Sequence, residues 1–158
     1  MLTGLGALLV ATPLAAPVST AAASMSCEML KSLKLPGTTI TLAETVAAGA
    51  FVPPAGRQGR GAAAFTETPA FCRVAATLTP STDSDIKIEV WLPSPGWNGK
   101  FQAVGNGGWA GVISYPALAQ AVSAGYAAAS TDTGHAGNSG AFALGHPEGD
   151  RLRLSRRS

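Results

Sequence analysis

The chain has 158 residues, a length that suits one domain or part of a larger one. Lys and Arg number 11 and Asp and Glu number 9, so the formal net charge is +2. This excess is carried by the tail, because residues 151–158 contain four Arg and no acidic residue. The rest of the chain has no basic cluster, which argues against a nucleic-acid partner. Hydrophobic residues make up 46% and charged residues 13%, which excludes extensive disorder.

The N-terminal segment predicts export. Residues 1–23 carry no charged side chain, and residues 2–16 are mostly Leu, Ala, Val and Gly. The apolar stretch is too short, and too interrupted by Pro13, to span a membrane. The small residues 21–23 fit a signal-peptidase site. We therefore expect a signal peptide over 1–23 and a secreted or periplasmic protein with no membrane partner after cleavage. A buried Ala-rich helix is the alternative.

The two cysteines, Cys27 and Cys72, predict a disulfide bond. An even number of cysteines favours pairing in an oxidising compartment. The bridge would close a loop of about 45 residues, which contributes roughly 3–4 kcal/mol in the chain-entropy model. Two unpaired, buried thiols are the alternative, and the spacing suits neither a zinc site nor a redox pair.

The remaining chain predicts an α/β fold. Residues 27–33 can form one or two helical turns, and 38–46 has the β-branched content of a strand in an N-terminal arm. Residues 51–69 are rich in Gly, Ala and Pro and predict a surface loop. The strands expected after this loop are 72–79, 86–93, 100–104 and 126–131.

One helix is expected between the last two of these strands, over residues 116–124. Pro116 suits its first turn, and Gly125 suits its C-terminal end. The small residues of 126–131 fit a fully buried parallel strand. An antiparallel strand pair would thus be followed by a right-handed strand–helix–strand crossover, which is how a mixed α/β sheet begins.

Residues 105–111, Gly-Asn-Gly-Gly-Trp-Ala-Gly, carry the chemistry that the sequence suggests. In one interpretation, their backbone N–H groups stabilise a developing oxyanion, as in the loop after the third strand of α/β-hydrolases. In another, Gly105-x-Gly107-x-x-Ala110 is a relaxed dinucleotide fingerprint, with Asp132 as the ribose-binding acid. The oxyanion interpretation is favoured because a dinucleotide helix should begin at the second glycine. A turn without chemistry is the third possibility.

Residues 130–135, Ser-Thr-Asp-Thr-Gly-His, follow a predicted parallel strand, where open α/β sheets place functional loops. Asp132 and His135 could act as an acid–base pair. We favour a role in structuring the loop, because an Asp in a turn commonly accepts backbone N–H bonds. His146 is expected to be a loop residue only. No metal-ligand cluster and no Gly-x-Ser-x-Gly nucleophile segment occur in the sequence.

Four segments in this order give the chain a family resemblance: 88–93, 97–101, 105–111 and 130–135. Together they resemble the tannase and feruloyl esterase family over roughly residues 27–150. Members are secreted serine esterases with an α/β-hydrolase core and an inserted lid, and they hydrolyse esters of plant phenolic acids. The resemblance implies the N-terminal portion of an α/β-hydrolase fold with an incomplete sheet.

The resemblance also implies roles for individual residues. Gly107 or Gly108 would supply an oxyanion-hole N–H, and Cys27 and Cys72 would form a structural disulfide. Trp109, in the same loop, is a candidate substrate-binding residue.

The family's nucleophilic Ser, in a Cys-Ser-x-Gly-Gly setting, does not occur in this sequence, nor do the triad Asp and His or the calcium-binding lid. We therefore expect residues 24–150 to be the first part of an esterase domain that uses no cofactor of its own. Its substrate in the full protein would be a small phenolic ester. Residues 151–158 are expected to be an aberrant tail, typical of a frameshift. A non-catalytic secreted binding module or a decayed gene product is the alternative.

The same resemblance predicts a weakness in the sheet. The strand over 126–131 would lack the nucleophile-bearing strand beside it. We therefore expect this Ala-rich strand to be an exposed parallel edge.

Overall fold

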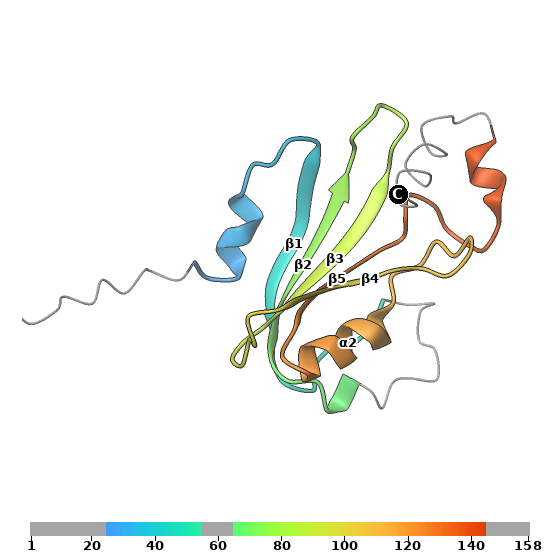
Figure 1. The fold of residues 1–158 in the computed structure, drawn as a ribbon. Coiled ribbons are helices and arrows are strands. Elements are labelled where there is room, and N and C mark those ends of the chain that lie inside the picture. Colours follow the sequence, from blue (N-terminus) through green and yellow to red (C-terminus); the bar gives the residue numbers. More distant parts are fainter. Residues whose placement is uncertain (1–24, 55–64, 145–158) are drawn as a thin grey trace, which may run out of the picture.

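The computed structural model describes residues 25–54 and 65–144, which build a twisted five-stranded sheet with a helix packed on it (Figure 1). No helix of these residues is long and apolar enough to cross a membrane. The expected signal peptide, the basic tail and His146 lie outside the described residues. The elements in chain order are η1 (Glu28–Ser32), β1 (Thr38–Val46), β2 (Phe71–Leu78), β3 (Ile86–Pro93), β4 (Phe101–Val104), α2 (Tyr115–Ser123), β5 (Ala127–Thr131) and η2 (Gly140–Ala143).

The sheet has the order β1-β2-β3-β5-β4. Neighbouring strands are antiparallel except for β4 and β5, which run parallel to each other. Helix α2 connects these two strands in the chain. This confirms the predicted α/β class, with antiparallel strands followed by a strand–helix–strand unit. The N-terminal arm belongs to the same sheet, because β1 pairs with β2 along its whole length.

The Ala-rich strand β5 is not an edge, and that expectation was wrong. Ala128 of β5 pairs with Trp91 of β3 on one side and with Gln102 of β4 on the other. After α2 the chain returns between β3 and β4. The small alanine side chains of β5 leave room there for the helix. The edges of the described sheet are β1 and β4, and Phe101 of β4 is 62% exposed.

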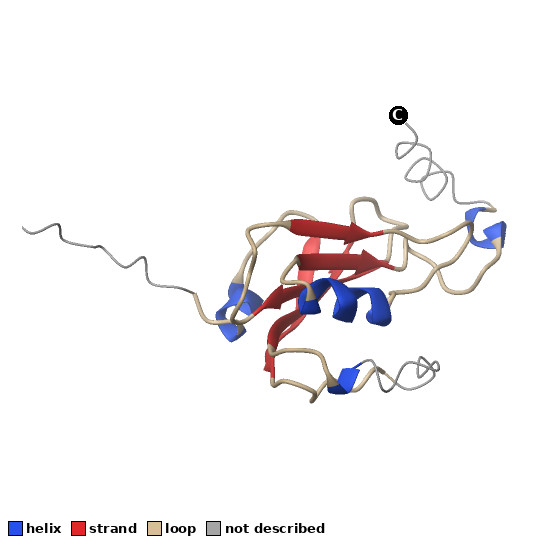
Figure 2. Ribbon diagram, turned by 60° about the horizontal axis from the view of Figure 1, so that its bottom comes forward, coloured by secondary structure: helices blue, strands red, loops and turns tan. Residues whose placement is uncertain are grey.

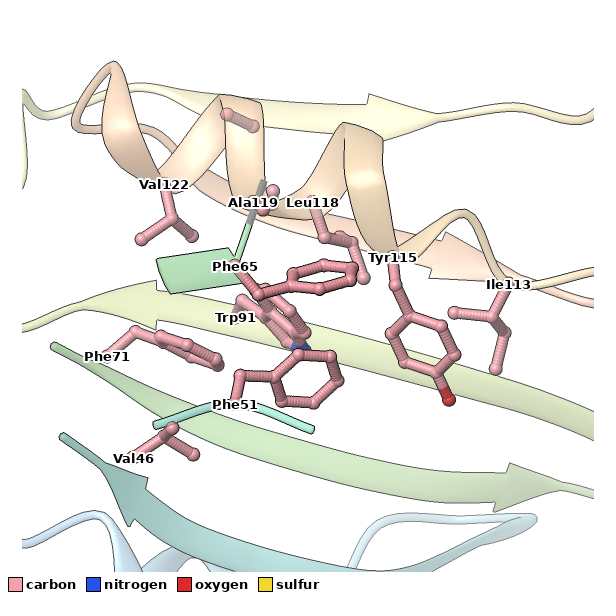
Figure 3. Close-up of a cluster of buried hydrophobic side chains, with 12 residues drawn as sticks. Val46, Phe51, Phe65, Phe71, Trp91, Ile113, Tyr115, Leu118, Ala119 and Val122 are labelled. Carbon is pink, nitrogen blue, oxygen red and sulfur yellow. The ribbon is translucent and has the colours of Figure 1, made fainter. Parts of the chain in front are cut away.

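Helix α2 packs on one face of the sheet (Figure 2), and the main core lies between them. Phe71 and Trp91 stack with ring centroids 4.1 Å apart, and Phe51 meets Trp91 edge-on at 4.6 Å (Figure 3). Aromatic pairs in these geometries add to the free energy gained by burial. The buried residues of this cluster are Val46, Phe51, Phe65, Phe71, Trp91, Ile113, Tyr115, Leu118, Ala119, Ala121, Val122 and Ala128. The expectation of a surface loop over 51–69 was therefore wrong at both ends of that range, because the Phe51 and Phe65 rings are buried in this core.

A second, smaller core lies on the opposite face, around Ala43 and Val74. There the predicted disulfide joins Cys27, just before η1, to Cys72 of β2, with their α-carbons 5.5 Å apart. Glu28 adds a polar contact, since its carboxylate accepts hydrogen bonds from the Thr45 amide and hydroxyl. The N-terminal segment is thereby fixed to the sheet.

Helix α2 begins and ends as the sequence predicts. Pro116 lies in its first turn, and Gly125 follows its last residues with a φ of 80°. The Tyr126 and Gly125 amides donate to the carbonyls of Ala121 and Val122, which is the Schellman pattern of helix ends. Gly125 also lies close to the turn before β4, because an added Cβ would meet the Gly96 oxygen at 2.8 Å.

One buried charge lies in the main core. Glu89 is 3% exposed, and its carboxylate accepts two hydrogen bonds from Arg73, at 3.0 and 2.6 Å. The Trp91 indole and the Tyr115 hydroxyl donate to the same carboxylate. The hydrogen bond to Glu89 raises the pKa of Arg73 above its ordinary value, and this effect outweighs partial burial. The pair is thus neutralised and hydrogen-bonded, as a buried ion pair requires.

Candidate functional site

The glycine loop and the loop after β5 lie at the same end of the sheet (Figure 1). The first leaves the C-terminal end of β4, and the second leaves the C-terminal end of the parallel strand β5. Asn106 joins them, since its side-chain amide donates to the Thr131 carbonyl at 2.7 Å. This is the end of an open α/β sheet at which ligands bind.

Residues 107–110 form a tight turn. The Ala110 amide donates to the Gly107 carbonyl at 3.1 Å, and Gly108 has a φ of 56°. A positive φ at only the first central position is the pattern of a type II′ turn, which favours glycine there. The turn is open to solvent, because a Cβ added to Gly107 or Gly108 would meet nothing within 4 Å.

Gly107 offers an N–H group at this open surface. Among the described residues, its amide has no hydrogen-bond partner. A backbone donor that is exposed and fixed in a turn is suited to bind an oxyanion. Of the two glycines that the sequence singled out, Gly107 therefore has the clearer geometry for this chemistry.

Trp109 follows in the same turn, with 47% of its surface exposed. Its ring lies over Gly140, where an added Cβ would be 3.4 Å from the ring atoms. The ring also meets Phe142 edge-on, with centroids 6.4 Å apart. Half of the indole is thus held by the protein, and half faces solvent beside the turn.

Asp132 and His135 both bind main-chain groups. One carboxylate oxygen of Asp132 accepts from the amides of Lys87 and Gly134, each at 2.9 Å, which fixes the turn to β3. His135 Nε2 lies 2.8 Å from the Trp109 carbonyl oxygen, in the glycine turn. These contacts fit a loop-structuring role, whereas an acid–base pair would need its reactive atoms exposed to substrate.

Sequence reasoning did not predict three structural features of this site. Gly111 forms an antiparallel bridge with Gly137, and its amide donates to the Gly137 carbonyl at 2.8 Å. Thr133 has a φ of 59°, which is uncommon for a β-branched residue. Phe142 stacks on the imidazole of His135, with ring centroids 3.9 Å apart. Only the glycines have a signal in the sequence, and that signal does not identify their contacts.

The dinucleotide interpretation does not fit the geometry. Helix α2 begins at Tyr115, well after the glycine turn, so its N-terminus does not start at the second glycine as that motif requires. Asp132 uses its carboxylate within its own turn and toward β3. Among the described residues, no three His, Cys, Asp or Glu side chains form a group that could hold a metal ion.

A separate groove of about 390 Å³ lies across β2 and β3, lined by Arg73, Glu89 and Tyr115 among others. Arg73 and Glu89 bind each other there, and Tyr115 donates to Glu89, while Lys87, which also lines the groove, pairs with Asp85. Ser130 is also engaged, because its buried hydroxyl oxygen accepts from the Ser114 amide at 3.0 Å. The glycine turn therefore remains the candidate site.

Comparison with known proteins gives consistent matches. The family model described as "Tannase and feruloyl esterase" matches residues 72–152. An uncharacterized esterase of Xanthomonas campestris pv. campestris is 45% identical over 133 residues, which cover 83% of this chain and 22% of that protein. Feruloyl esterase C of Talaromyces stipitatus is 35% identical over 131 residues, covering 79% of this chain and 24% of that protein.

A solved structure shows the same fold. The crystal structure of feruloyl esterase B from Aspergillus oryzae superposes with a TM-score of 0.69 and 30% sequence identity. The match covers 80% of this chain and 24% of that chain. The chain thus spans about a quarter of the length of the relatives that it matches.

Proposed function

The chain belongs to the tannase and feruloyl esterase family, and from that premise we propose that it forms the first part of a secreted carboxylic ester hydrolase. Residues 24–150 would be the N-terminal part of the α/β-hydrolase domain. The observation that carries the proposal is the exposed Gly107 amide, which has no partner among the described residues, in a turn after β4.

In the proposed reaction, a serine hydroxyl attacks the ester carbonyl, the alcohol leaves, and water hydrolyses the acyl-enzyme. The carbonyl oxygen becomes negative in the tetrahedral intermediate. The Gly107 amide, with Gly108 as the second candidate, would donate a hydrogen bond to this oxygen. The serine, acid and histidine would come from a part of the esterase outside the printed 158 residues. The described residues bind no cofactor in this proposed reaction.

The proposed substrates are small esters of phenolic acids. Support comes from the names of the relatives, several of which are feruloyl esterases. The half-exposed Trp109 ring lies beside the turn, where it could contact an aromatic acyl group. Export is supported by the Cys27–Cys72 disulfide, since such bonds persist in oxidising compartments.

A hybrid enzyme tests this proposal. Residues 25–144 would replace the matching segment of the Aspergillus oryzae feruloyl esterase B, which has the same fold in this region. We expect the hybrid to hydrolyse methyl ferulate. Gly107→Pro removes the amide proton and should lower kcat by about 10²–10³-fold, as for loss of one oxyanion donor. Gly107→Ala keeps the amide and should stay within about threefold of the hybrid.

Two outcomes would contradict the proposal. A hybrid that folds, as judged by circular dichroism, but has no activity would favour the non-catalytic binding module or decayed product. A Gly107→Pro hybrid with full activity would remove Gly107 from the oxyanion site. The 158-residue chain by itself should not hydrolyse methyl ferulate or methyl gallate, because the sequence contains no serine in a nucleophile motif.

A further inference from the structure

The carbonyl of Trp109 is bound by a side chain from the neighbouring loop. His135 Nε2 lies 2.8 Å from this oxygen, and a carbonyl oxygen can only accept. Nε2 must therefore carry a proton and donate it. The peptide unit that it binds joins Trp109 to Ala110, and the Ala110 amide closes the turn onto Gly107. His135 thus contacts the turn at the unit that defines its shape.

Thr133 lies on the other side of the imidazole. Its hydroxyl donates to the Asp132 carbonyl at 2.6 Å, and the hydroxyl oxygen lies 3.2 Å from His135 Nδ1, where it limits rotation of the ring. Thr133 makes these contacts from a left-handed backbone conformation, with a φ of 59°. Strained residues of this kind persist where the surrounding structure requires them, and they cluster at functional sites.

One face of the ring is also covered. His135 is 8% exposed, and Phe142 stacks on it at 3.9 Å with planes only 10° apart. Both nitrogens and one face of the ring are thus occupied by neighbours. A histidine held in this way is suited to orient a backbone group and unsuited to exchange protons with a substrate.

We propose that His135, oriented by Thr133 and Phe142, is a positioning residue for the glycine turn. It fixes the Trp109 carbonyl, so that the peptide units at Gly107 and Gly108 keep the orientation in which an amide faces solvent. Its importance for catalysis rests on the proposed function. Its effect on the turn is a property of this chain and can be measured without any ester.

Two variants of the full chain separate the hydrogen bond from the packing. His135→Phe keeps a buried ring against Phe142 but has no donor. His135→Gln keeps a donor at a similar reach but loses the ring. Amide hydrogen exchange would be followed at Ala110 and Gly111, which both donate to carbonyls in these loops.

We expect His135→Phe to lower protection at Ala110 and Gly111 about five- to tenfold, the loss of one hydrogen bond. Amides of β2 and β3 should change less than twofold, and His135→Gln should recover most of the protection. The NMR chemical shift of the Trp109 carbonyl carbon should change in His135→Phe and return toward its original value in His135→Gln. Unchanged protection and shift in His135→Phe would overturn the proposal.

Thr133→Gly tests the proposal even if His135→Phe destabilises the whole protein. Glycine relieves the backbone strain, so a Thr133 with no role should be replaced without loss. We expect protection at Gly111 to fall at least threefold while β2 and β3 are unaffected or better protected. Unchanged protection at Gly111 would overturn the positioning role. None of these readouts depends on activity, so a failure here and an inactive hybrid enzyme are distinct results.

Discussion

The α-carbon of Gly111 lies against the carbonyl oxygen of His135, and a Cβ added to Gly111 would be 2.1 Å from that oxygen. The His135 ring atom Cδ2 would be 2.8 Å away. The two loops that follow β4 and β5 are therefore in direct main-chain contact, with no side chain between them. The shape of the glycine turn depends on this contact as well as on its own sequence.

The first prediction is that Gly111→Ala destabilises the protein by about 2–3 kcal/mol, the cost of overpacking a site that cannot relax easily. The cause is steric, because the contact is with backbone atoms and Gly111 does not have a positive φ. Gly107→Ala is the matched control, since its Cβ would meet nothing within 4 Å, and it should cost less than about 0.5 kcal/mol. Urea unfolding compares the stabilities of both variants. Equal unfolding midpoints would contradict the prediction.

Local sequence patterns predicted most elements of this fold. Alternation of apolar and polar residues in 86–93 and the Pro116 and Gly125 signals identified β3 and α2 to within about a residue. These signals work because they reflect backbone chemistry that acts over a few positions. The disulfide between Cys27 and Cys72 was predictable for a different reason, since two cysteines allow only one pairing.

The second prediction concerns the buried pair of Arg73 and Glu89. Glu89→Leu removes the acceptor for two Arg73 bonds and for the Trp91 and Tyr115 donors. It should cost about 3–5 kcal/mol, because the largely buried Arg73 keeps only the half-exposed Glu44 carboxylate, 3.3 Å away, as an ionic partner. Adding Arg73→Met should recover part of this loss, because hydrophobic replacement of a whole buried pair is often tolerated.

An exposed ion pair at the start of β3 is the control for this experiment. Lys87 and Asp85 form a salt bridge with both side chains largely in solvent. Asp85→Asn should change the free energy of unfolding by less than about 1 kcal/mol. A Glu89→Leu variant no less stable than Asp85→Asn would show that the buried network does not stabilise the fold.

The third prediction is that the disulfide holds the N-terminal segment against the sheet. Replacing both Cys27 and Cys72 by Ser should lower the free energy of unfolding by about 3–4 kcal/mol, through the greater entropy of the unfolded chain. Reduction of the unaltered protein should have the same effect. Two thiols that react with an alkylating agent in oxidised, exported protein would exclude the bond in solution.

Other parts of the fold and site could not be predicted from local patterns. The position of β5 inside the sheet depends on which side of β4 the chain returns to, and no residue of 126–131 determines that side alone. Thr133 adopts a left-handed backbone conformation against its intrinsic preference. An argument from residue propensity would place it in the extended or right-handed helical region. The position of β5 results from pairing with strands distant in sequence, and the conformation of Thr133 accompanies side-chain contacts with Asp132 and His135 that propensity does not describe.

The fourth prediction concerns β4, which together with β1 forms the edges of the described sheet, whereas β5 lies inside it. Phe101–Val104 contains no charged residue, and its side chains are exposed or only partly buried. Such an edge presents unpaired N–H and C=O groups and invites pairing with another chain. We therefore expect the 158-residue chain to self-associate as its concentration rises, measured by analytical ultracentrifugation.

A charge on this edge should reduce the association. Ala103→Lys adds a cation to the middle of β4, as edge strands of monomeric proteins commonly do. Gln120→Lys adds the same charge to an exposed position of α2 and should leave self-association unchanged. Both variants should unfold within a few degrees of the original protein, because neither position is buried. A chain that stays monomeric at all concentrations, or two variants that reduce association equally, would show that the β4 edge does not mediate self-association.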